Sequence, residues 1–325
     1  MLASTPDVAA IAQAITGEAA DVRVIMPAGA DVHSFTVSSE QVRSLQQAAL
    51  VLFANSQDLG FEQTLKSALG KTPSLDWPDY EAEGASLRDY PDYPRNPHGP
   101  WLRLDNAAAM ARAMARAFVR LGLPKAVIES NQQQFERELA AQQAVYIKLA
   151  DDHRLRERPL LVVIPGLCDL IANMDVPVGA VLMAEGSGTV SGQTLADAVT
   201  KLKTGQYGGI VCPLSMKQSK QGEAARQVAA DSGAPVAYVR FQDTNLERDT
   251  YLSVSAYNAA ALAALGGGAA KPAAGQPAIQ GLSWPWLALL AVAVLLIGLL
   301  IGLKTRRSVI CVHGAGIFED SADGD

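Results

Sequence analysis

Histidine is the residue type whose placement in this chain most suggests chemistry. The chain has only four histidines. Two of them lie in loops, His33 in PAGADVHSF after the apolar run VRVIM and His98 in NPHGPWLRLDNA before a helical pattern. Binding groups are common in loops at the ends of strands and helices. A single loop histidine is more often a solvated polar residue, so a functional interpretation rests on the pair.

The cysteines are the second group of residues that could carry chemistry. Three are present, Cys168, Cys212 and Cys311, which is too few for a disulfide scaffold, and none has the CxxC spacing of a zinc ribbon. Three interpretations of Cys168 and Cys212 stay open: thiolate ligands of a metal, a disulfide in an oxidising compartment, or small buried hydrophobic residues. A nucleophilic thiol with a histidine base would instead make the chain an enzyme. No phosphate-binding or dinucleotide-binding glycine motif is present, and we expect no enzymatic activity.

Short apolar runs that alternate with helical patterns must position these side chains. The predicted strands are 22–26, 50–54, 160–164, 179–183, 209–212 and 236–241. The predicted helices are 8–16, 39–48, 61–69, 106–121, 195–204, 222–232 and 249–265. This alternation is typical of parallel sheets in an α/β architecture. The stretch from Pro124 to His153 has no Gly and no further Pro, and its apolar residues recur at helical spacing, so it predicts one long helix between two α/β halves.

The chain is thus divided into an N-terminal lobe (1–122), a connecting helix (123–156) and a C-terminal lobe (157–265), followed by a flexible Pro/Gly-rich linker (266–282). Residues 283–304 contain the uncharged run WLALLAVAVLLIGLLIGL, which is long enough for a membrane span of about 20 residues. Because KTRR follows this run, the positive-inside rule places residues 1–281 outside the cell membrane and a disordered tail (305–325) in the cytoplasm. The first residues lack the apolar core of a signal peptide, so either the leader is missing from this chain or the membrane orientation is reversed. We expect the missing leader.

Two segments carry a family resemblance. PAGADVHSFTVSSEQV resembles the loop that supplies the first metal-binding histidine of the zinc/manganese substrate-binding proteins of metal ABC transporters (cluster A-I), and NPHGPWLRLDNAAAMARAMA resembles their second histidine motif. The resemblance extends over most of residues 4–265. It implies two α/β lobes with parallel sheets joined by one long backbone helix, a metal held between the lobes, and His33 and His98 as ligands from the N-terminal lobe. Zinc members often carry a long His/Asp-rich loop between the two motifs, whereas the corresponding segment here has no histidine.

The C-terminal lobe departs from the family pattern. The third ligand of the family, a His or Glu, aligns near Pro165 or Gly166, and the last, an Asp, aligns near Arg240. Proline has no ligand atom, and arginine carries a fixed positive charge that would oppose a cation. The nearest replacements are Cys168, Cys212 and Asp243. Two histidines with two thiolates would suit tetrahedral Zn(II), and thiolates would favour Cu(I) over Mn(II).

We therefore expect a membrane-anchored, extracytoplasmic component of an ABC importer that captures Zn(II), with Mn(II) or Cu(I) as the alternatives, and delivers it to a permease subunit. Its contact with the lipid bilayer is expected through the C-terminal helix. The alternative function is an accessory binding module of the same fold that has lost the standard metal site. Such a module would bind another ligand, with Arg240 contacting an anion, or a membrane partner. The net charge of −6 and the lack of a Lys/Arg cluster argue against nucleic acid as a partner.

Overall fold

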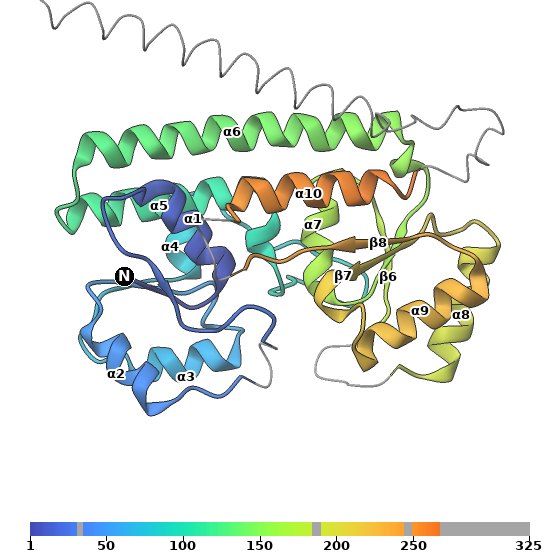
Figure 1. Ribbon diagram of the computed structural model, residues 1–325, viewed down its shortest axis with the longest axis horizontal. Coiled ribbons are helices and arrows are strands. Elements are labelled where there is room, and N and C mark those ends of the chain that lie inside the picture. The colour runs from blue at the N-terminus through green and yellow to red at the C-terminus, as the bar shows by residue number, and fades with distance from the viewer. Residues whose placement is uncertain (31–34, 184–189, 244–248, 267–325) are drawn as a thin grey trace, which may run out of the picture. The chain divides into compact units, whose positions relative to one another are not determined.

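Two parallel β-sheets form the framework of the protein (Figure 1). The computed structural model describes residues 1–30, 35–183, 190–243 and 249–266, which all belong to one compact unit, Met1–Gly268. The strand order is β2-β1-β3-β4 in the first sheet and β6-β5-β7-β8 in the second, with parallel neighbours throughout both. The strands are β1 Leu2–Ala3, β2 Arg23–Val24, β3 Val51–Leu52, β4 Ser74–Leu75, β5 Leu160–Val162, β6 Val178–Val181, β7 Ile210–Pro213 and β8 Val236–Val239. The prediction of two α/β lobes with parallel sheets is confirmed.

Helices connect the strands and cover both sheets. The N-terminal lobe contains α1 Pro6–Thr16, α2 Ser39–Gln47, α3 Gly60–Ala68, α4 Trp77–Glu81 and α5 Leu104–Arg120. The C-terminal lobe contains α7 Cys168–Ala172, α8 Gly192–Lys203, α9 Lys220–Ser232 and α10 Tyr251–Ala263. Polar side chains fix the starts of several helices; at α2, for example, Ser38 and Gln41 form a reciprocal capping box. The short helices α4 and α7 and the two-residue strands β1 and β4 were not predicted from the sequence.

The long helix predicted over 124–153 is α6, Lys125–Asp152. Its 28 residues give a length of about 42 Å at about 1.5 Å per residue. Figure 1 shows α6 running along both lobes, beside α1 and α5 at one end and α10 at the other. Asn131 Nδ2 donates to Ile15 O at 3.1 Å, and Tyr146 Oη donates to Ser255 O at 2.9 Å, so α6 is bonded to a helix of each lobe.

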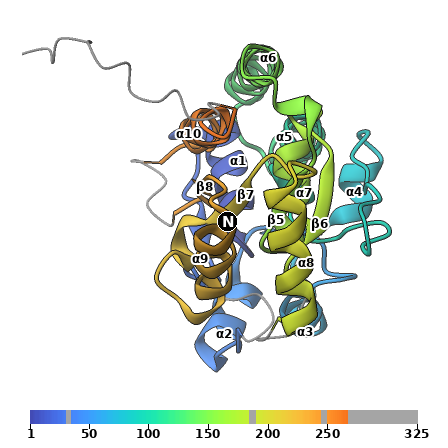
Figure 2. The same ribbon diagram turned by 90° about the vertical axis from the view of Figure 1, so that its right-hand side faces the viewer.

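Two hydrophobic cores lie around the sheets. The larger core contains residues of the first sheet, α1, α5, α6, α10 and one side of the second sheet. The smaller core lies between the second sheet and the pair α8 and α9. In Figure 2, α6 and α10 lie above the strands of the second sheet, and α8 and α9 extend below them. The second sheet is thus covered on both sides, as parallel sheets require.

The predicted membrane segment falls outside the described part of the chain. Residues 283–304, the tail 305–325 and all but the first residue of the linker 266–282 are not described. Within the described ranges, no helix combines the length and the apolar character needed to cross a bilayer.

Candidate metal centre

His98 is a buried residue at the boundary between the lobes, and only 8% of its surface is exposed. Its backbone is held by the neighbouring Asn96: His98 N–H donates to Asn96 Oδ1 at 3.2 Å, and Asn96 Nδ2 donates to His98 O at 3.3 Å. The Tyr93 ring lies edge-on to the imidazole, with the ring centroids 6.4 Å apart. The other predicted histidine ligand, His33, lies outside the described residues.

The loop of His98 touches the C-terminal lobe at the turn η3, Pro165–Leu167. Asn96 Nδ2 donates to Pro165 O at 3.1 Å. The residue after His98, Gly99, lies so close that a Cβ atom built on it would be 2.4 Å from Gly166 O. The family resemblance implies a third ligand near Pro165 or Gly166. The structure therefore brings this position against the His98 loop, although neither residue offers a metal-binding side chain.

The segment after His98 is fixed by side chains of the C-terminal lobe. Tyr251 Oη, at the start of α10, donates to Trp101 O at 2.8 Å. Asn173, which follows α7, donates through Nδ2 to Leu102 O at 2.9 Å and accepts from Leu104 N–H at 3.0 Å. These bonds hold η1, Pro100–Leu102, and the start of α5 against the C-terminal lobe. The sequence pattern contained no signal for them, because each joins residues far apart in the chain.

Asp169 is a buried acidic residue of α7 that the sequence analysis did not single out. It is fully buried, and this burial raises the pKa of its carboxyl to about 7. Tyr90 Oη donates to Asp169 Oδ1 at 3.0 Å, and Asn96 Nδ2 donates to Oδ2 at 3.2 Å. The only sequence signal was a charged residue within the apolar stretch LCDLIA.

Arg240 directly follows β8, near the position where the family resemblance implies the last ligand. Asn258 of α10 accepts from Arg240 N–H at 2.7 Å and donates to Arg240 O at 2.8 Å. The guanidinium group forms an ion pair with Asp249 and lies over the Tyr257 ring, 5.6 Å from its centroid. The positive charge at this position is therefore neutralised by a neighbouring carboxylate.

Cys168 and Cys212 are free thiols, which corrects the disulfide alternative. Both are fully buried, Cys168 in the larger core and Cys212 in the smaller one. Packing in two different cores is the physical reason that they do not pair. Burial raises the pKa of the Cys168 thiol to about 12 and that of Cys212 to about 11, so both are protonated at neutral pH.

Asp243, the remaining predicted ligand, is exposed to solvent. Within the described ranges, no group of three or more His, Cys, Asp or Glu side chains is placed to hold a metal ion. Because His33 lies outside these ranges, the complete ligand set stays a prediction.

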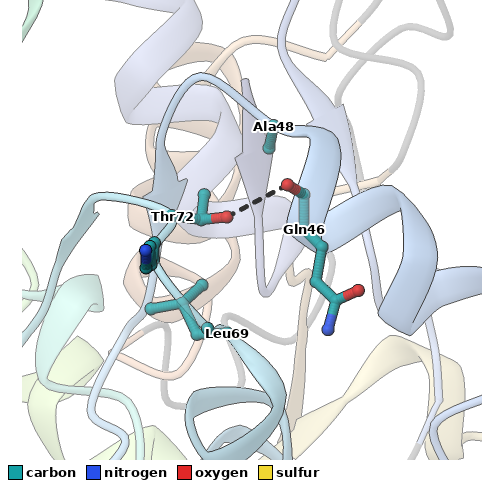
Figure 3. A pocket seen from close by; sticks show the side chains of 6 residues that line it. Gln46, Ala48, Leu69 and Thr72 are labelled. Carbon is teal, nitrogen blue, oxygen red and sulfur yellow. Dashed lines mark hydrogen bonds between the residues drawn. The ribbon is translucent and has the colours of Figure 1, made fainter.

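The N-terminal lobe also has a surface depression that none of the candidate metal ligands lines (Figure 3). It is lined by Gln46, Ala48, Leu69, Gly70, Lys71 and Thr72. Thr72 Oγ1 donates to Gln46 O at 3.2 Å across it. None of its lining side chains is a carboxylate, thiol or imidazole, so it does not suit a transition metal.

Comparison with known proteins agrees with the fold. The family model described as "Zinc-uptake complex component A periplasmic" (ZnuA) matches residues 1–265. A crystal structure of ZnuA is 20% identical and covers 82% of this chain and 96% of its own, with a TM-score of 0.65. A cadmium-bound periplasmic metal binding protein from Candidatus Liberibacter asiaticus is 18% identical and covers 82% and 98%, with a TM-score of 0.66.

The manganese-bound form of that protein is 17% identical, with the same coverage and a TM-score of 0.65. No curated protein sequence matches the chain significantly. The family model nevertheless covers both lobes and the long helix between them. The chain belongs to the family of zinc-uptake complex component A periplasmic proteins, the ZnuA family.

Proposed function

We propose that this chain is the metal-binding component of an ABC importer, which captures a transition-metal cation between its lobes and passes it to a permease subunit. The observation that carries the proposal is the position of His98, which is buried and held against the Pro165–Gly166 turn of the opposite lobe. Membership of the ZnuA family supports the same function. Zn(II) is the proposed cargo, and Cu(I) and Mn(II) are the alternatives. The donor atoms of the site determine which of these metals is preferred.

His33 and His98 are the proposed imidazole ligands. Cys168 is the candidate thiolate closest in sequence to the Pro165 turn, and Cys212 and Asp243 are the other candidates. Since burial raises the pKa of both thiols, a metal that binds them must displace a proton and draw the sulfur out of a packed core. A bound cation provides the driving force for such proton loss. We therefore expect the histidines to dominate affinity, and the cysteines to determine whether Zn(II) or Cu(I) is preferred over Mn(II).

The proposed location is the outer side of the cell membrane. Residues 283–304 are proposed to form a single membrane-spanning helix, with residues 1–281 outside and 305–325 in the cytoplasm. A tether of this kind would raise the effective concentration of the binding lobes near the permease. Protease added to intact, outer-membrane-permeabilised cells should digest residues 1–281 and leave a small membrane-bound fragment. Complete protection of the chain would contradict this topology.

Metal stoichiometry is the direct test of the proposed cargo. The purified chain is loaded with Zn(II), freed of excess metal and measured by elemental analysis, beside His33→Ala, His98→Ala and the control His153→Ala at the end of α6. We expect about one equivalent in the wild-type chain and in the control, and its loss in the other two variants. No bound metal in a folded wild-type chain would contradict the proposal.

A second candidate function is supported by the C-terminal lobe. The family resemblance implies a histidine or glutamate ligand near Pro165 or Gly166 and an acidic ligand near Arg240. Arg240 already has a partner in Asp249. A protein of this fold without a metal site would act as an accessory module that binds an anion or a membrane partner. Two results together would favour this function. The wild-type chain would fail to load metal, and a small anion would raise its unfolding temperature but would not raise that of Arg240→Gln.

A further inference from the structure

A short turn of the N-terminal lobe reaches both His98 and the C-terminal lobe. Tyr90 and Tyr93 face each other across this turn, with Tyr90 N–H donating to Tyr93 O at 3.0 Å and Tyr93 N–H donating to Tyr90 O at 2.9 Å. The Tyr93 ring packs edge-on against His98. The Tyr90 hydroxyl group reaches Asp169 on α7. One turn thus joins a candidate metal ligand to the opposite lobe.

Asp169 accepts side-chain hydrogen bonds from two residues of the other lobe. Tyr90 Oη donates to one carboxyl oxygen at 3.0 Å, and Asn96 Nδ2 donates to the other at 3.2 Å. Asp169 and Asn96 are completely buried. A buried carboxyl group without hydrogen-bond donors is unfavourable. Separation of the lobes at this point would remove both donors and must therefore admit water to Asp169.

Asn96 couples this contact to the position of His98. Its Nδ2 group lies within hydrogen-bond distance of His98 O, Pro165 O and Asp169 Oδ2, at 3.3, 3.1 and 3.2 Å. Its Oδ1 atom accepts from His98 N–H. The same amide therefore fixes the backbone of His98 and bonds to two residues of the C-terminal lobe. A change in the contact between the lobes here must change the surroundings of His98.

We propose that Tyr90, Asn96 and Asp169 form a latch between the lobes that holds His98 in its buried position, and that opening of this latch exposes His98 to solvent. The bonds of Tyr251 and Asn173 to residues 101–104 lie farther along the chain, so the latch opens without loss of the whole contact between the lobes. The three residues are positioning residues. Their importance for metal exchange rests on the proposed function, whereas the latch itself requires no metal.

The test measures how fast diethyl pyrocarbonate modifies His98 in the metal-free full chain, by mass spectrometry of the His98 peptide. Tyr90→Phe removes only the hydroxyl group that reaches Asp169. Tyr207→Phe is the matched control, because its hydroxyl group donates to Gly179 O within the C-terminal lobe. Loss of one hydrogen bond to a carboxylate should raise the rate roughly tenfold in Tyr90→Phe and leave it unchanged in the control. Equal rates in the two variants would overturn the proposal.

A second experiment exchanges the donor and the acceptor of the hydrogen bond between Asn96 and Asp169. Asn96→Asp places two carboxyl groups against each other and should expose His98 more strongly than Tyr90→Phe. In Asn96→Asp/Asp169→Asn the donor and acceptor of this bond are exchanged, and we expect protection of His98 to return in part. No recovery in the double variant would contradict the latch. Because metal is absent, these results are independent of whether the chain binds Zn(II), and the stoichiometry measurement alone decides the proposed function.

Discussion

The contact between Gly99 and Gly166 permits a quantitative test of how the lobes meet beside His98. Gly99 has a φ of +91°, in the left-handed region, and a Cβ atom on it would lie 2.4 Å from Gly166 O. Cβ atoms are essentially never found under 3.0 Å from another heavy atom, and ordinary contacts begin at 3.4 Å. In Gly99→Ala the two backbone segments must therefore separate by about 3.4 − 2.4 = 1.0 Å to reach ordinary contact.

Two costs add in Gly99→Ala. A left-handed φ costs an L-residue about 1–2 kcal/mol, and forcing an extra methyl group into a packed contact costs about 1–3 kcal/mol. The free energy of unfolding should therefore fall by about 2–5 kcal/mol. Gly122→Ala is the matched control, because Gly122 has a φ of +89° and open space where its Cβ would lie. Gly122→Ala should incur only the first of these costs, the one for the left-handed φ.

Urea unfolding of the purified wild-type chain and both variants, followed by circular dichroism, measures this difference. The loss should be greater in Gly99→Ala than in Gly122→Ala by about 1–3 kcal/mol. Gly99→Ala should also speed the modification of His98. If the two variants lose the same stability, the Gly99–Gly166 contact does not exist in solution, and the position of His98 against the opposite lobe is wrong.

Two further predictions concern a buried acid and the position after β8. Burial raises the pKa of Glu62 from 4.5 to about 7, so the folded chain holds this proton while the unfolded chain releases it. Glu62 therefore lowers the free energy of unfolding by up to about 3 kcal/mol as pH rises from about 4.5 to 7. Urea unfolding across this range should show a weaker decline of this free energy in Glu62→Gln. An unchanged decline would refute the raised pKa of Glu62. Arg240→Asp replaces a positive charge with an aspartate, the residue type that the family resemblance implies as a ligand near this position. Competition with a coloured chelator should show at least tenfold tighter Zn(II) binding than in the charge-removing control Arg240→Gln, and equal affinities would mean that this position does not face the metal.

The fold was predictable from the sequence where a hydrophobic pattern extended over many consecutive residues. The alternation of apolar runs and helical patterns indicated the two lobes, and the Gly-free stretch after Pro124 indicated α6. The two-residue strands β1 and β4 lie outside longer apolar runs like those that indicated the equally short β2 and β3, and the five-residue helices α4 and α7 are too short for a periodic pattern to emerge. Their formation depends on neighbours that are distant in the chain.

The candidate site was predictable only in part. The loop motif led to His98, and the family resemblance led to the Pro165–Gly166 turn that the structure places beside it. The bonds of Asn96 and Tyr90 to Asp169 join residues more than seventy positions apart, and no sequence pattern specifies them. Cys168 and Cys212 appeared as candidate ligands from residue type alone, whereas their burial in two separate cores appears only in the folded chain.

X-ray absorption at the zinc edge reports the atoms that surround the metal and therefore shows whether His98 is a ligand. The full chain loaded with one equivalent of Zn(II) should show imidazole scattering at about 2.0–2.1 Å, reduced in His98→Ala and retained in His153→Ala. A shell at about 2.3 Å would add a thiolate, and its loss in Cys168→Ser or Cys212→Ser would identify which cysteine supplies it. A spectrum with no imidazole contribution, or one that His98→Ala leaves unchanged, would contradict the assignment of His98 as a metal ligand.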